Sequence, residues 1–100
     1  MKIFISQPMR GKTEQQILDE RMKAVDKVSK LFNDEEVIIA ESYQKNLYKN
    51  ANPLYCLSKS LELMSKCDLV VFVEGYQNAR GCKIEHECAK EYGYGILYLW

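Results

Sequence analysis

The sequence predicts an α/β fold in which a four-stranded parallel sheet is covered by helices on both faces. Short apolar runs alternate with longer stretches in which apolar residues recur every three to four positions, as strands alternate with helices. The runs are apolar at successive positions, so both faces of each strand should be buried, as in parallel sheets. Right-handed crossovers and a reversal after the second strand give the order 2-1-3-4 of a compact, three-layer flavodoxin-like fold.

Four segments are predicted to be strands because they are short, apolar and bounded by turn residues or charges. They are Lys2–Ser6, Val37–Ala40, Leu69–Val73 and Gly95–Trp100.

Three segments have helical spacing. The first begins at Thr13, which with Gln16 forms a capping-box sequence, and runs to Phe32. The second begins at Pro53, a residue suited to the first position of a helix. The third is predicted over Gly81–Tyr92, directly after the loop that follows the third strand.

Composition limits the classes of function. The 100 residues suit a single domain, residues 1–100, with 14 basic and 14 acidic side chains. This balance favours neither polymeric nucleic acid nor an anionic membrane as a partner. No signal peptide and no run of 18 apolar residues is evident. The four cysteines form no CxxC pair, which predicts reduced thiols in a cytoplasmic protein.

A metal site is not expected. Cys82 and His86 stand four residues apart on one predicted helix, but two further ligands at close spacing are not evident. A small core thiol and a solvated histidine explain the pair better than a metal site does.

The topology predicts where a ligand binds. In open parallel sheets, ligands bind beyond the carboxyl ends of the strands where the strand order reverses, here between the first and third strands. The loop Ser6–Lys12 follows the first strand and leads into a helix. Gly11 allows a ligand to approach the backbone closely, and Arg10 and Lys12 supply positive charge. These features suit a phosphate or sugar hydroxyls, although an ordinary turn with two solvated cations fits them as well.

The other loop at this point, Glu74–Gly81, carries amide, aromatic and guanidinium groups that suit a small polar ligand. Tyr43 follows the second strand and borders the same cleft, where it would stack on a base or cover the sheet edge. Tyr48 and Tyr55 are better explained as a subunit contact.

Glu85 is the most informative residue of the chain. On a helical wheel it falls inside the apolar arc formed by Gly81, Ile84, Cys88, Ala89 and Tyr92. Carboxylates are rarely buried without a partner or a task, and the nearby helix start is expected to keep this one ionised. Such a group suits a nucleophile or general base; the alternative is a structural ion pair with Arg80. Asp68, by contrast, lies at the amino end of the third strand and is expected to be a helix-stop or turn residue.

Several segments together resemble one known family. They are Lys2–Gly11, Glu41–Tyr43, Cys67–Phe72 and Arg80–Glu85. They resemble the nucleoside 2-deoxyribosyltransferase superfamily, which includes deoxynucleoside monophosphate N-glycosidases, and most closely its small branch. The resemblance covers nearly the whole chain. Three positions depart from it: Ser60 and Ala79 stand where aspartates are expected, and Lys83 stands in place of a glycine.

The resemblance implies cleavage or transfer of the N-glycosidic bond of a deoxynucleoside or its monophosphate, with Glu85 as the nucleophile. It implies no metal or organic cofactor, and a homo-oligomer, dimer or larger. The residues expected to hold the sugar, phosphate or base are Ser6, Gln7, Met9, Arg10, Gly11, Tyr43, Asn78, Arg80 and Gly81. Two alternatives stay open: a non-catalytic module that binds or sequesters a nucleotide-derived ligand, and a scaffold with a vestigial cleft.

Overall fold

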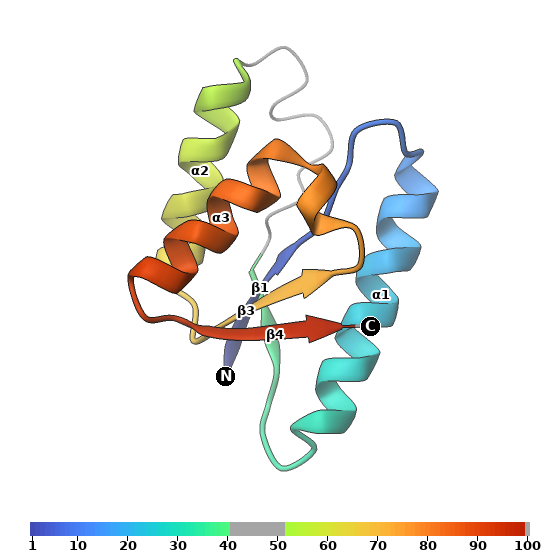
Figure 1. The fold of residues 1–100 in the computed structure, drawn as a ribbon. Helices are drawn as coiled ribbons and strands as arrows, with labels where there is room; N and C mark the ends of the chain where they lie inside the picture. Colours follow the sequence, from blue (N-terminus) through green and yellow to red (C-terminus); the bar gives the residue numbers. More distant parts are fainter. Residues whose placement is uncertain (41–51, 100) are drawn as a thin grey trace.

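The computed structural model describes residues 1–40 and 52–99, which form three layers with the sheet in the middle (Figure 1). Helix α1 lies on one face of the sheet, and α2 and α3 lie on the other. In chain order the elements are β1 (Lys2–Ser6), α1 (Glu14–Leu31), β2 (Ile38–Ile39), α2 (Pro53–Ser65), β3 (Leu69–Val73), the 3₁₀ turn η1 (Tyr76–Asn78), α3 (Arg80–Glu91) and β4 (Gly95–Leu99).

The sheet confirms the predicted fold class. All neighbouring strands are parallel, and their order is β2-β1-β3-β4, so the fold is flavodoxin-like. β2 is shorter than the predicted Val37–Ala40, although the Ala40 N–H continues its hydrogen bonding to the Ile3 carbonyl at 2.8 Å. An edge strand has a partner on one side only, and half of the Ile38 surface is exposed.

The two strand faces are buried against different helices. Ile3 and Ile5 of β1 pack with Ala24 and Val28 of α1, whereas Phe4 packs with the residues that α2 and α3 bury. Because side chains alternate along a strand, Ser6 shares the face of Phe4, and the next residue returns toward α1. This alternation decides which helix each residue at the end of β1 can reach.

The predicted turn and cap residues have structural roles. Thr13 Oγ1 accepts the Gln16 N–H at 3.1 Å and Gln16 Oε1 accepts the Thr13 N–H at 2.8 Å, which confirms the capping box. Asp68 Oδ2 accepts the Lys2 N–H at 2.8 Å, and the Asp68 N–H donates to the Lys2 carbonyl at 2.7 Å. Asp68 therefore closes the amino end of the β1–β3 pair, away from the strands' carboxyl ends.

The buried face of α3 differs from the predicted arc. Cys82, Glu85 and Ala89 are buried, whereas Ile84 is 38% exposed and Tyr92 is 80% exposed. Hydropathy placed Ile84 at one edge of the apolar arc and Ala89 at the other, whereas the face buried in the structure is formed by Cys82, Glu85 and Ala89. Tyr92 lies beyond the last helical residue and does not extend that face. No helix in the described part of the chain is both long and apolar enough to cross a membrane.

Candidate functional site

A buried hydrogen bond joins the end of β1 to α3. Ser6, the last residue of β1, donates from Oγ to Glu85 Oε1 at 2.7 Å. Ser6 is 1% exposed and Glu85 is 7% exposed. The strand end fixes the hydroxyl, and the loop with η1 brings α3 back over β3 so that its second turn reaches that hydroxyl. The pair lies at the carboxyl end of the sheet, beside the two loops between which the topology predicts a ligand.

The carboxyl group of Glu85 is not held ionised, contrary to the expectation from sequence. Burial raises its pKa from an ordinary 4.5 to about 7, and the hydrogen bond from Ser6 offsets only part of that increase. α3 begins at Arg80, so Glu85 lies in the second turn, beyond the free N–H groups of the first. Near neutral pH both protonation states of Glu85 are populated.

The alternative role of Glu85, a structural ion pair, is absent from the described residues. Arg80 is exposed, and within residues 1–40 and 52–99 no ion pair joins it to Glu85. Glu85 Oε2 has no hydrogen-bond partner within those same ranges. Every fully enclosed side-chain nitrogen or oxygen in these ranges has a hydrogen-bond partner. Because Oε2 has none, it is not fully enclosed and keeps some contact with solvent. Ser6 therefore anchors Oε1, and Oε2 is open to solvent.

Cys82 is a neighbour of this pair that the sequence analysis did not assign to the site. It is 5% exposed, and burial raises the pKa of its thiol to about 11, while a hydrogen bond with Ser6 acts in the opposite direction. Its thiol is therefore neutral and unreactive near neutral pH. The spacing of three residues between Cys82 and Glu85 was the available signal, because it puts both on one helix face. All four cysteines are free.

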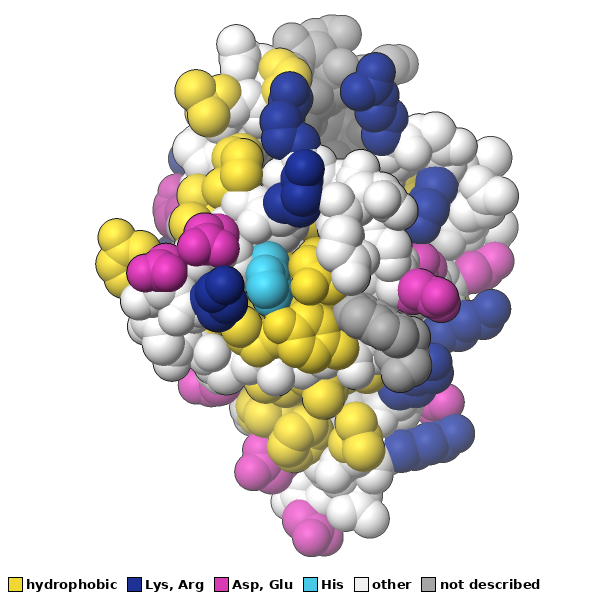
Figure 2. Space-filling view, in the orientation of Figure 1, with side chains coloured by type: hydrophobic (Ala, Val, Ile, Leu, Met, Phe, Trp, Pro, Cys, Tyr) yellow, Lys and Arg dark blue, Asp and Glu magenta, His cyan; other side chains and the backbone are white. Residues whose placement is uncertain are grey.

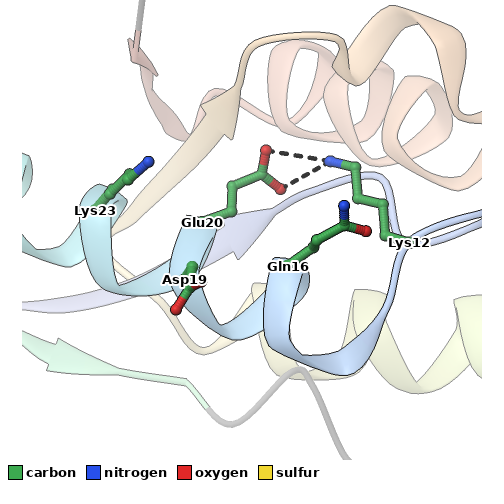
Figure 3. A pocket seen from close by; sticks show the side chains of 5 residues that line it. All are labelled: Lys12, Gln16, Asp19, Glu20 and Lys23. Atoms are coloured by element: carbon green, nitrogen blue, oxygen red, sulfur yellow. Dashed lines mark hydrogen bonds and ion pairs between the residues drawn. The ribbon is translucent and has the colours of Figure 1, made fainter.

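Gln7 and Lys12 turn toward α1 instead of toward Glu85. Gln7 Nε2 donates to the Ile17 carbonyl at 3.2 Å and to Glu20 Oε1 at 2.8 Å, and Gln7 Oε1 accepts from Arg21 Nη1 at 3.0 Å. Lys12 Nζ pairs with Glu20 at 3.1 Å (Figure 3). This network anchors the first loop to α1, and the Lys12 charge is largely neutralised by Glu20. Sequence reasoning missed Glu20 and Arg21.

A surface pocket of about 390 Å³ lies beside this network, and Glu85 is not among its lining residues. Figure 3 shows its lining side chains, which are Lys12, Gln16, Asp19, Glu20 and Lys23. Its two cations and two anions balance, and its lining side chains are all polar. Ligand sites that bury a base or sugar are mostly apolar. We therefore place the candidate site at Glu85, where the buried carboxylate lies.

The other predicted ligand residues of the two loops remain accessible. Met9 and Gly81 are half-buried, and Arg10, Gly11, Asn78 and Arg80 are exposed. Gly11 has φ of 80°, a left-handed conformation that favours glycine, and the Lys12 N–H closes the turn on the Met9 carbonyl at 3.2 Å. Tyr43 and Tyr48 lie outside the described residues. Tyr55 is exposed on α2, with Lys59 Nζ 5.6 Å from its ring centre.

His86 belongs to an aromatic cluster on α3, β3 and β4. Its Nε2 lies 2.6 Å from the Tyr98 hydroxyl, and the Phe72 and Tyr76 ring centres are each 5.0 Å from the imidazole. Figure 2 shows the chain's one histidine beside hydrophobic side chains on this face. The described residues contain no group of three or more His, Cys, Asp or Glu that could hold a metal ion. The cluster also anchors Tyr76, and with it the second loop.

Comparison with known proteins gives a family. No curated protein and no solved structure matches the chain. One family model matches residues 1–98, which include both candidate loops, Ser6 and Glu85. The chain belongs to the family that this model describes, Domain of unknown function (DUF4406).

Proposed function

We propose that this protein cleaves or transfers the N-glycosidic bond of a deoxynucleoside or its monophosphate, with Glu85 as the nucleophile. The observation that carries the proposal is the buried carboxyl group of Glu85 at the carboxyl end of the sheet, which has no ion-pair partner among the residues that the structure describes. Among residues 1–40 and 52–99 it is the only acidic side chain that is buried. The resemblance to the nucleoside 2-deoxyribosyltransferase superfamily assigns the nucleophile to the same residue.

The energetic cost of Glu85 supports a functional role. A pKa raised from 4.5 to about 7 means that ionising this group destabilises the fold by about 3 kcal/mol above neutral pH. A glutamine of the same shape would avoid that cost. Groups that reduce stability without serving packing are concentrated at functional sites.

The proposed reaction has two steps and retains configuration. Ionised Glu85 attacks the anomeric carbon through Oε2, forming a C–O bond as the C–N bond to the base breaks, and the departing base takes up a proton from solvent. Water or a second base then attacks the same carbon from the opposite side, releasing the carboxylate; water gives up one proton in doing so. Each step inverts the anomeric carbon, so the net result is retention.

The loop residues would supply binding energy around this centre. Arg10, exposed beside the left-handed turn at Gly11, suits a phosphate group. Asn78 and Arg80 lie on the other loop, where they would border the base. Gln7 acts indirectly, because its polar atoms bind α1 and so hold the first loop in place.

One observation favours the second candidate function, a non-catalytic module that binds a nucleotide-derived ligand. Ala79 stands at the position preceding α3, and Ser60 lies half-buried on α2, where the resemblance leads one to expect aspartates. Glu85 thus has no acidic neighbour at either position to assist catalysis or base recognition.

Release of free base separates the two functions. The protein is incubated at pH 8, where roughly nine-tenths of Glu85 would be ionised, with a panel of deoxynucleosides and their monophosphates, and free base is followed by chromatography. We expect release by the wild type and by the control Glu87→Gln, an exposed change on the same helix, and none by Glu85→Gln. Saturable binding without release from any member of the panel would support the binding module instead.

A further inference from the structure

We infer that Ser6 is the positioning residue for Glu85: its hydroxyl anchors Oε1 and leaves Oε2 as the oxygen that meets the reacting carbon. This inference deepens the proposed function and assigns Ser6 a role other than contact with the sugar or phosphate. It rests on the 2.7 Å hydrogen bond, on the burial of both residues and on the open state of Oε2.

The geometry leaves Ser6 no freedom to act on a ligand while it serves Glu85. A serine hydroxyl can donate only one hydrogen bond, and here Ser6 Oγ donates it to Glu85 Oε1. Ser6 is 1% exposed and is held by strand pairing to β3, where it stands opposite Phe72. Because strand pairing holds Ser6 in place, its hydrogen bond restricts the orientations that the Glu85 carboxylate can take, as a catalytic group requires.

Cys82 lies on the same helix face as Glu85, and its thiol interacts only weakly with the same hydroxyl. Since its thiol is neutral, its S–H can donate to Ser6 Oγ while Ser6 donates to Glu85. When Glu85 takes up a proton, the Ser6 hydroxyl can turn and donate to the Cys82 sulfur. The hydroxyl thus has a partner in both protonation states. No charged side chain in the described ranges contributes to the pKa of Glu85, so Ser6 is the main group there that favours the ionised form.

The test measures the Glu85 carboxyl directly, without substrate. Glutamate labelled with ¹³C at the carboxyl carbon is incorporated, the Glu85 resonance is assigned by its loss in Glu85→Gln, and the resonance is followed against pH. We expect Ser6→Ala to shift its midpoint upward by about one to two pH units. Ser6→Thr, which keeps the hydroxyl, should restore the wild-type midpoint. Ser6→Cys, a nearly isosteric change to a weaker donor, should give a smaller upward shift and serves if Ser6→Ala does not fold.

Cys82→Ala is the matched control. Like Ser6→Ala, it removes one small polar atom from the buried interior, in this case from α3 instead of β1. It should move the midpoint by less than about half a unit, since it leaves the Ser6–Glu85 hydrogen bond in place. An unchanged midpoint in Ser6→Ala or Ser6→Cys, or an equal shift in Cys82→Ala, would overturn the inference.

A second readout connects positioning to chemistry. In the base-release assay, the pH dependence of the Ser6→Ala rate should move upward by the same amount as the titration midpoint. The two claims fail separately: a shifted titration without base release from any variant refutes the proposed function alone. Base release with an unshifted titration refutes the role of Ser6 alone.

Discussion

Replacing Glu85 by glutamine should change the pH dependence of stability. The folded state holds the Glu85 proton with a pKa of about 7 instead of 4.5. Below about pH 4.5 the group is mostly protonated in both folded and unfolded chains, so folding does not bury a charge there. As pH rises, the unfolded chain ionises first, and the wild type loses stability until the folded group has also ionised near pH 7.

The magnitude follows from the pKa difference. At about 1.36 kcal/mol per unit, the shift amounts to about 3 kcal/mol of destabilisation above neutral pH. Glu85→Gln removes the titration but keeps an acceptor for the Ser6 hydroxyl. The variant should therefore gain about 3 kcal/mol relative to the wild type between pH 4.5 and pH 8.5.

Urea denaturation of both proteins across this pH range, with a reducing agent for the free thiols, measures the difference. Other titrating groups are shared and cancel in the comparison. Glu87→Gln is the control; its side chain is 61% exposed on the same helix, and its difference from wild type should stay nearly flat. A Glu85→Gln difference that is equally flat would refute the argument that burial shifts this carboxyl group.

Three further predictions test the chemistry and the assembly. The rate of base release should rise with pH through a midpoint near 7, because the nucleophile must be ionised; a rate that falls over the same range would identify Glu85 as a general acid. Monophosphates should bind more tightly than nucleosides, and Arg10→Ala should remove most of that difference, about 1.5–3 kcal/mol by calorimetry; equal affinities in the wild type would exclude the phosphate site. Light scattering should give a homo-oligomer, since Leu54 and Tyr55 expose apolar surface on α2, and a concentration-independent mass of 11.7 kDa would contradict this.

The fold could be predicted from sequence because its central strands leave few alternatives. Leu69–Val73 is apolar at every position, which suits only a strand covered on both faces, and Thr13 and Pro53 mark helix starts by local chemistry. The length of β2 was overestimated, because the sequence of an edge strand does not show how many of its residues pair with the neighbouring strand.

The burial of Glu85 was predicted from sequence, but the protonation of its carboxyl group was not. The helical wheel placed Glu85 on an apolar face, yet the rotation of α3 is set by packing against β3, so Ile84 and Tyr92 were wrongly included. The raised pKa depends on burial depth, which the sequence does not contain. The partners of Gln7 and Lys12 were also missed, because Glu20 is one of several acidic residues on α1 and only the fold selects it.

Mass spectrometry of the protein after a rapid acid quench examines the proposed nucleophile itself. During turnover of a deoxynucleoside substrate, the wild type should carry one added deoxyribosyl group, and proteolysis should locate it on the peptide that contains Glu85. Glu85→Gln should show neither the adduct nor free base. An adduct on a different peptide, or base release by Glu85→Gln at the wild-type rate, would contradict the assignment of Glu85 as the nucleophile.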